Sequence, residues 1–170
     1  MLIVISGLPG TGKSAVAAAL AARLGAVHLS IDPVEDALLG AGFPRSWETG
    51  VAAYEATRVM AEQNLAFGTP VVVDAVNDSE PARQTWRVAA ANAGAELAFV
   101  LLALDDEGEH RRRLEGRVRE LAHVPEPSWE DVLARAAAYA PWAEGACLRI
   151  DAERAVDEVV LELMGRLSGR

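Results

Sequence analysis

A glycine-rich segment between an apolar run and an alanine-rich run constrains the fold of this chain more than any other feature. The segment reads Gly7-Leu8-Pro9-Gly10-Thr11-Gly12-Lys13-Ser14 and matches the pattern G-x-x-x-x-G-K-[ST]. Residues 2–5 before it are continuously apolar, as in a strand buried on both faces, and residues 13–24 are typical of a helix. This order predicts a strand, a tight turn and a helix in succession, the unit from which parallel α/β sheets are built.

The glycines of this phosphate loop, residues 7–14, allow backbone N–H groups to converge on phosphate oxygens, and the helix start adds its positive dipole end. Lys13 is the only lysine of the chain and would bridge the β- and γ-phosphates of a nucleotide. The Ser14 hydroxyl would bind Mg²⁺. An ordinary glycine-rich turn is the alternative, but the strand-to-helix context favours a nucleotide site. The expected phosphate-binding residues are Leu8, Pro9, Gly10, Thr11, Gly12, Lys13 and Ser14.

The composition of the 170 residues argues against several classes of protein. A hydrophobic content of 51% at this length is typical of one packed domain over residues 1–170. The net charge of −9 disfavours binding to long nucleic acids, and the apolar stretch 97–104 is too short to span a membrane. The single cysteine, Cys147, can form neither an internal disulfide nor a zinc cluster. We expect a cytoplasmic protein, monomeric or homodimeric, without a membrane or nucleic-acid partner.

Apolar runs alternate with helix-forming runs along the rest of the chain. Strands are expected at residues 27–31, 71–74, 97–104 and 148–150, and helices at 34–39, 48–67, 79–93, 107–121, 129–139 and 155–167. This alternation predicts a parallel α/β sheet with helices on both faces.

The residues that follow the strands distinguish a kinase from a hydrolase or a switch. Asp74 ends an apolar run and fits the carboxylate that holds the water shell of Mg²⁺. The next residue is Ala75, where a hydrolysing motor would need a glutamate to activate water. Asp105 to Gly108 matches the loose D-x-x-G pattern of GTPases, but no Asn-Lys-x-Asp guanine motif accompanies it. The sequence therefore favours phosphoryl transfer over hydrolysis.

Asp32 lies just after the second expected strand, two residues after Ser30, where a carboxylate would face the γ-phosphate from the acceptor side. It could accept the proton of a substrate hydroxyl during in-line transfer. Because Asp-Pro is also a common helix start, Asp32 could instead cap the next helix, and the two roles are compatible.

The arginine-rich helix 107–121 is expected to supply cations for the transferred phosphoryl group. Arg113 and Arg117 are four residues apart and would share one helix face, with one on the adenine ring and the other at the phosphates. Arg111 and Arg112 fit a solvated face paired with neighbouring glutamates.

Together with Ser30-x-Asp32, Val71-Val-Val-Asp74-Ala-Val-Asn77 and Arg113-Leu-Glu-Gly-Arg117, the phosphate loop resembles that of the P-loop kinases of small molecules. The most similar branch holds the zeta-toxin and chloramphenicol-phosphotransferase kinases, with gluconate, adenylylsulfate and polynucleotide 5′-kinases as relatives. The resemblance implies an α/β three-layer sandwich with a five-stranded parallel sheet in the order 2-3-1-4-5. It also implies ATP with Mg²⁺ as the phosphoryl donor.

The same resemblance implies roles for individual residues. The family's aspartate after the second strand is the base for the acceptor hydroxyl and matches Asp32. The family's Arg-x-x-x-Arg pair places its first arginine beside adenine and its second on the phosphates, which matches Arg113 and Arg117. The lid region, residues 113–127, departs from the longer lids of the family and offers Arg119 and His123 as further basic residues.

In such kinases the insertion between the second and third strands, here residues 33–67, holds the acceptor. Two aromatic residues at helical spacing are more often core than pocket residues, and an arginine beside glutamates can simply pair with them. His28, inside a strand, is expected to be satisfied in the core. The candidates for acceptor binding are Glu35, Trp47, Tyr54 and Arg58 in the insertion, with Asn77 and Arg83 after the third strand.

We therefore predict an ATP-dependent phosphotransferase that acts on a hydroxyl of a small molecule, either a metabolite or an antibiotic. Asp32 is the expected base, and Lys13 and Arg117 would stabilise the transferred phosphoryl group. Ser14 and Asp74 would organise Mg²⁺. The alternatives are a polynucleotide 5′-kinase, which would need a basic channel that the net charge disfavours, and a nucleotide-binding ATPase without a kinase role.

Overall fold

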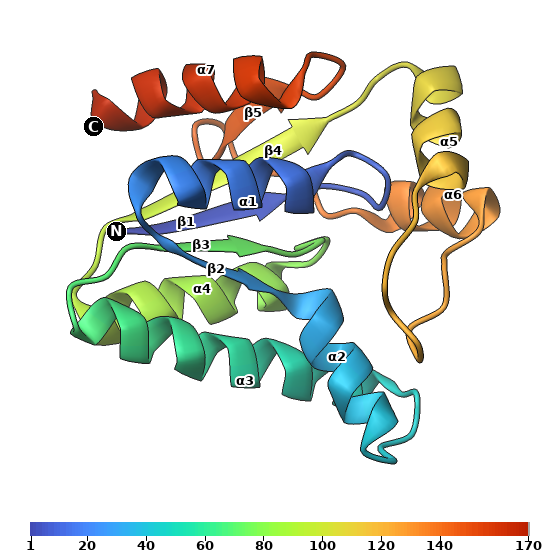
Figure 1. Ribbon diagram of the computed structural model, residues 1–170, viewed down its shortest axis with the longest axis horizontal. Coiled ribbons are helices and arrows are strands. Elements are labelled where there is room, and N and C mark those ends of the chain that lie inside the picture. Colours follow the sequence, from blue (N-terminus) through green and yellow to red (C-terminus); the bar gives the residue numbers. More distant parts are fainter. Residues whose placement is uncertain (170) are drawn as a thin grey trace.

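A computed structural model describes residues 1–169 and shows a five-stranded parallel sheet between two layers of helices (Figure 1). The strand order is β2-β3-β1-β4-β5, so the α/β architecture and the sheet order that we expected are confirmed. The strands are β1 (Leu2–Ser6), β2 (Val27–Ser30), β3 (Val71–Asp74), β4 (Leu97–Ala103) and β5 (Leu148–Asp151).

Within residues 1–169, seven helices connect or follow these strands. In Figure 1, α1 and α7 cover one face of the sheet and α3 and α4 cover the other, while α2, α5 and α6 gather at the edge toward which the strand arrows point. The helices are α1 (Lys13–Leu24), α2 (Ile31–Gly40), α3 (Trp47–Ala66), α4 (Glu80–Ala93), α5 (Glu107–Gly116), α6 (Trp129–Ala138) and α7 (Val156–Ser168).

The central strand β1 is buried on both faces, as its uninterrupted apolar run predicts. Ile3 and Ile5 belong to the core beneath α1 and α7. Leu2 and Val4 point the other way, into the core beneath α3 and α4. Successive side chains of one strand thus enter two separate cores and hold both helical layers to the sheet.

The register of the strands brings their carboxyl ends to one edge of the sheet. Ile5 of β1 lies beside Asp74 of β3, and Asp74 in turn lies beside Ser30 of β2. Polar residues that end or follow these strands are therefore neighbours although they are far apart in the sequence.

One helix prediction was wrong in a way that affects the site. Helix α5 ends at Gly116 instead of residue 121, and Arg117 has an extended backbone with φ −77° and ψ 144°. Glycine is a poor helix former, and the chain leaves the helix here as a connection between α5 and α6, residues 117–128. Arg113 and Arg117 consequently do not share a helix face.

None of the helices within residues 1–169 is both long enough and apolar enough to cross a membrane.

Candidate active site

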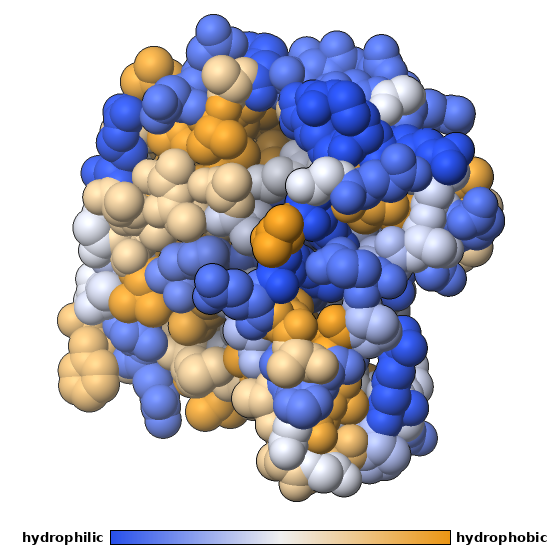
Figure 2. Space-filling view, turned by 45° about the vertical axis from the view of Figure 1, so that its right-hand side comes forward, coloured by the Kyte–Doolittle hydropathy of each residue, from blue (hydrophilic) through white to orange (hydrophobic). Residues whose placement is uncertain are grey.

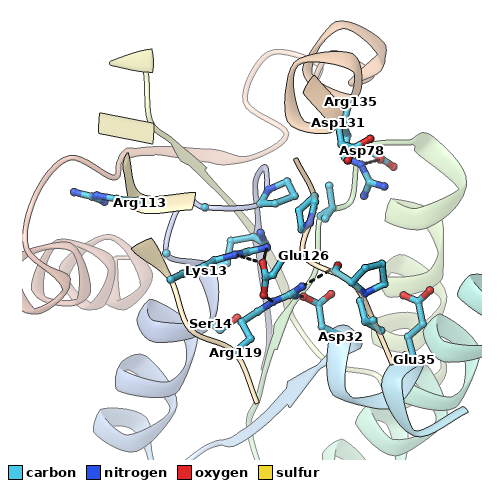
Figure 3. Close-up of a pocket in the computed structure, with 18 of the residues that line it drawn as sticks. Lys13, Ser14, Asp32, Glu35, Asp78, Arg113, Arg119, Glu126, Asp131 and Arg135 are labelled. Atoms are coloured by element: carbon cyan, nitrogen blue, oxygen red, sulfur yellow. Dashed lines mark hydrogen bonds and ion pairs between the residues drawn. The ribbon is translucent and has the colours of Figure 1, made fainter. Parts of the chain in front are cut away.

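A cavity of about 990 Å³ lies at the carboxyl edge of the sheet, between the phosphate loop, α2, α6 and the α5–α6 connection. Figure 2 shows this side of the molecule turned forward, with hydrophilic side chains gathered over much of it. Charged side chains from all four of these segments enter the cavity (Figure 3). Its charged residues are Lys13, Asp32, Glu35, Arg45, Asp78, Arg113, Arg117, Arg119, Glu126, Asp131 and Arg135.

The phosphate loop has the backbone that anion binding requires. Gly10 and Gly12 adopt left-handed conformations with φ of 90° and 88°, and a Cβ on Gly7 would lie 2.6 Å from the carbonyl oxygen of Leu102. Helix α1 has no side-chain cap and no acidic residue in its first turn, so its N–H groups remain available to an anion. This N-terminus opens into the cavity through Gly12 and Lys13.

Lys13 supplies the positive charge at the centre of the cavity. Its Nζ donates a hydrogen bond to the carbonyl oxygen of Leu8 at 2.9 Å. Burial lowers the pKa of Lys13 to about 8, although Asp74 and Asp32 act in the opposite direction. A bound phosphate would favour the protonated form, because it would place further negative charge beside the ammonium group.

Asp74 accepts hydrogen bonds from three side chains of two neighbouring segments. Ser14 donates to Oδ1 at 2.8 Å, Ser30 donates to the same oxygen at 3.2 Å, and His28 Nε2 lies 2.6 Å from Oδ2. A hydroxyl and a carboxylate held side by side are oxygen donors of the kind that Mg²⁺ prefers. Within residues 1–169, no cluster of three His, Cys, Asp or Glu side chains forms a ready-made metal site. A magnesium ion here would therefore be held by the Ser14 hydroxyl and the Asp74 carboxylate, with phosphate oxygens and water as its other ligands.

His28, which the sequence prediction expected to be satisfied in the core, is satisfied by Asp74 and is only partly buried. It lies two residues before Ser30 on β2, so both side chains point to the same face and reach Asp74. This alternation and the pairing of β2 with β3 were both expected, but the register that sets Ser30 beside Asp74 was not.

Asp32 lies in the first turn of α2 and faces the cavity. The helix starts one residue earlier than Asp32 and its N-cap is Ser30, so Asp32 is not the cap. Arg119 Nη1 donates to Asp32 Oδ2 at 2.6 Å. Glu35, one turn further along α2, lines the same wall, and burial, followed by the charge of Asp32, raises the pKa of Glu35.

Two arginines of the α5–α6 connection enter the cavity and share one carboxylate. Arg117 Nε and Arg119 Nε donate to the two oxygens of Glu126, at 2.7 and 2.6 Å. Arg117 Nη2 lies 2.6 Å from Glu126 as well, but it makes no well-directed hydrogen bond within residues 1–169. Figure 3 shows Arg119 between Glu126 and Asp32.

Arg113 lies at the rim of the cavity and points away from the other labelled residues (Figure 3). Its guanidinium donates to the carbonyl oxygens of Ala152 and Glu153, just after β5. It also donates to Glu109, and the hydrogen bonds from Arg112 and Arg113 lower the pKa of Glu109 to about 2. Arg113 thus joins α5 to the segment after β5 at one side of the cavity.

Of the acceptor-binding candidates, only Glu35 lines the cavity. Trp47 is the first residue of α3, and its side chain is 78% exposed outside the cavity. Arg58 is paired with Glu55 and Glu62 along α3. The structure does not bring Trp47 or Arg58 to the site, because α3 turns these positions toward solvent or toward its own glutamates.

Tyr54, Asn77 and Arg83 form a buried polar cluster behind the site instead of an acceptor wall. The Tyr54 hydroxyl accepts the backbone N–H of Asn77, and burial raises the pKa of Tyr54. Asn77 donates to Ser6 and accepts from Trp86 Nε1. These hydrogen bonds occupy the polar groups that an acceptor would have needed.

The cavity also contains charged residues that were not among the predicted site residues. Arg45 precedes α3, Asp78 follows β3, and Asp131 and Arg135 come from α6. Arg135 lies 3.7 Å from Asp78. The position of Asp78 after a strand could have indicated a site residue. The α6 residues belong to no motif that links them to the phosphate loop.

The comparisons with known proteins agree with this architecture. A sugar kinase from Janibacter sp. HTCC2649 aligns with a TM-score of 0.74 and 14% identity, over 98% of this chain and 94% of that one. A gluconokinase from Sinorhizobium meliloti 1021 aligns with a TM-score of 0.68 and 23% identity, over 98% and 90%. The APS kinase of Mycobacterium tuberculosis aligns with a TM-score of 0.68 and 20% identity, over 98% and 96%.

These identities show a shared fold. No curated protein matches the sequence. Residues 2–139, which contain the phosphate loop, Asp32, Asp74 and the α5–α6 connection, match a family of AAA domains (AAA_33). The chain belongs to this AAA domain family and has the α/β fold of P-loop kinases.

Proposed function

We propose that this protein is an ATP-dependent phosphotransferase that moves the γ-phosphate of ATP to a hydroxyl of a small molecule. The observation that carries this proposal is that the phosphate loop and the Asp32 carboxylate face one cavity from different sides. A phosphate-binding loop alone would serve any nucleotide-binding protein. A carboxylate across the same cavity provides a base for a second substrate.

The proposed reaction assigns one task to each group. Lys13 and Arg117 stabilise the charge that develops on the transferred phosphoryl group. Asp32 accepts the proton of the acceptor hydroxyl while that oxygen forms its bond to the γ-phosphorus and the bond to the ADP oxygen breaks. Mg²⁺, held through Ser14 and the Asp74 carboxylate, would neutralise charge on the β- and γ-phosphates.

The acceptor would lie between α2 and α6. Glu35 and Arg45 line this part of the cavity, and within residues 1–169 neither side chain makes a hydrogen bond or an ion pair. The known relatives in fold include kinases named for sugars, gluconate, APS and shikimate, and the APS kinase structure holds AMPPNP and APS. These names support a small polar acceptor, of the metabolite or antibiotic type that the zeta-toxin and chloramphenicol-phosphotransferase branch would suggest.

The regional assignments also remain part of the proposal. Residues 1–170 would act as one P-loop kinase domain, with the acceptor insertion at residues 33–67 and the lid at residues 113–127. Within the insertion, α2 provides the cavity wall, whereas α3 contributes mainly to the core that supports it.

The proposal is tested by ATP turnover of the purified protein, first alone and then with hydroxylated metabolites, aminoglycosides, phenicols, nucleosides and 5′-hydroxyl oligonucleotides. We expect ADP release to be stimulated by one class of small molecule, which gains the mass of one phosphate. Stimulation by oligonucleotides alone would identify a polynucleotide kinase. Hydrolysis that no acceptor changes would favour a nucleotide-binding ATPase.

Two variants assign the activity to this cavity. Lys13→Ala should abolish transfer, and Asp32→Asn should lower kcat by about 100-fold or more while ATP binding is retained. Asp157→Asn is the matched control, because Asp157 is an exposed residue of α7 that is paired only with Arg23 within residues 1–169. Full transfer activity in Lys13→Ala would contradict the proposal.

A further inference from the structure

The α5–α6 connection is fastened to α2 by a carboxylate that takes no part in the proposed reaction. Asp36 Oδ1 accepts the backbone N–H groups of His123 and Val124, at 2.7 and 2.8 Å. One turn further along α2, a Cβ on Gly40 would lie 2.9 Å from the His123 ring. Helix α2 therefore has Gly40 where the His123 ring packs against it, and the Asp36 carboxylate where the backbone of the connection turns.

The other end of the connection meets the same helix through side chains. Arg119 reaches Asp32, four residues before Asp36 and on the same helix face. Glu126 holds Arg119 and Arg117 together. The position of both arginines over the cavity thus depends on how the connection is fixed to α2.

We propose that Asp36 is a positioning residue that holds the α5–α6 connection over the cavity, so that Arg119 occupies Asp32 until an acceptor hydroxyl replaces it. The first part of this inference, the anchoring of the connection by Asp36, rests on the contacts alone. The second part, the pairing of Arg119 with Asp32 until an acceptor binds, rests on the proposed kinase function. With Arg119 on Asp32 Oδ2, this carboxylate oxygen is engaged by a guanidinium N–H and is less accessible to an attacking water. The arrangement would suppress hydrolysis of ATP when no acceptor is present.

An arriving acceptor changes this pairing. Its hydroxyl hydrogen-bonds to Asp32 in place of the Arg119 guanidinium. Arg119, still bound to Glu126 beside Arg117, then lies where negative charge develops on the transferred phosphoryl group. Asp36 matters in both states, because it anchors the backbone from which these arginines extend.

The first part is tested by hydrogen exchange, which needs no substrate. Asp36→Ala removes the acceptor of both N–H groups, whereas Asp36→Asn keeps an Oδ1 oxygen in the same place. We expect the amides of His123 and Val124 to exchange about tenfold faster in Asp36→Ala than in the unmodified protein, and near the original rate in Asp36→Asn. Glu144→Ala is the control, because Glu144 is exposed and lies outside the cavity. Unchanged exchange in Asp36→Ala would overturn the anchoring role.

The second part is tested by ATP turnover without an acceptor and with the acceptor found for the unmodified protein. We expect Asp36→Ala and Arg119→Ala to raise acceptor-independent hydrolysis severalfold and to lower kcat for transfer, with the change in Asp36→Ala reversed in Asp36→Asn. Equal basal hydrolysis in all variants of an active kinase would refute the masking of Asp32. If the unmodified protein transfers no phosphate but exchange changes as expected, the proposed function fails while the anchoring role stands.

Discussion

Lys13 shows how burial sets the chemistry of a single side chain. Its side chain is partly buried at the base of the cavity, and desolvation lowers the pKa of Lys13 to about 8. The nearby carboxylates of Asp74 and Asp32 only partly oppose this effect. The charge of Lys13 is thus incompletely stabilised by the protein's own groups, and a bound polyanion can stabilise it further.

This pKa predicts how nucleotide affinity depends on pH. Below about pH 8 Lys13 is protonated before ATP binds, whereas above it binding must take up a proton, so affinity should fall as pH rises. Calorimetry of ATP binding at pH 7 and pH 9, in buffers of different ionisation enthalpy, measures the affinity and the proton uptake. Lys13→Met should bind weakly and lose the uptake. Identical proton uptake at both pH values would contradict the lowered pKa.

Residues of the site differ in how far the sequence could predict them. Lys13 and Ser14 were predicted correctly because they belong to a short motif that defines the whole phosphate loop around them. Asn77 and Arg83 sit at similarly suggestive positions after a strand, but the fold buries them. A polar side chain that follows a strand can enter the cavity or satisfy the core, and the difference lies in what packs against it.

At the scale of elements, α5 supports the phosphate loop from behind. His110 Nε2 donates to the carbonyl oxygen of Pro9 at 2.7 Å, and its ring packs edge-on against Trp129 of α6. A Cβ on Gly10 would lie 3.1 Å from the His110 ring, so the loop and the helix are in close contact. The conformation of the loop therefore depends on a helix that follows it by about a hundred residues in the chain.

Loss of this support should weaken both the fold and the site. His110→Phe keeps an aromatic ring against Trp129 but leaves the Pro9 carbonyl without its donor, which should lower the free energy of unfolding by about 1–2 kcal/mol. ATP affinity should fall with it, because the loop is less well held. Denaturant unfolding and ATP titration measure the two effects. Arg112→Ala, an exposed position on the same helix, should change neither.

The clearest error of the sequence prediction concerns the end of a helix. Helix α5 was expected to continue to residue 121, since arginine and glutamate are good helix formers. It ends at Gly116 because the residues that follow form contacts that are not possible in a continued helix. The most important are the hydrogen bonds of Arg117 and Arg119 to Glu126. Local propensity is weak enough for such tertiary contacts to override it.

At the scale of the whole molecule, Arg83 joins parts of the chain that no local element connects. It is almost fully buried in α4 and donates to the carbonyl oxygens of Asn77, Ala140 and Pro141. Its guanidinium also stacks on Trp142, with 3.8 Å to the ring centre. The turn after β3 and the segment after α6 are thereby held together behind the cavity.

Replacing this arginine should destabilise the protein more than it changes the site. Arg83→Met fills similar space but leaves three carbonyl oxygens without a donor, which should cost about 3 kcal/mol or more. Thermal and denaturant unfolding measure this loss, and Arg87→Met, partly exposed on the same helix, is the control. A variant with normal stability and a raised KM for the acceptor would instead restore Arg83 as an acceptor-binding residue.

The sequence by itself determined the phosphate loop, the alternation of strands and helices, the position of Asp74 at the end of its strand and that of Asp32 just after its strand. These features are local, since backbone conformation and side-chain spacing over a few residues define them. Only the tertiary structure decided which polar residues face the cavity, because that depends on contacts between distant segments. It turned Tyr54, Asn77 and Arg83 into the core, joined His28 to Asp74 and brought Arg119 onto Asp32, since a buried polar group needs a partner and folding alone determines which one lies within reach.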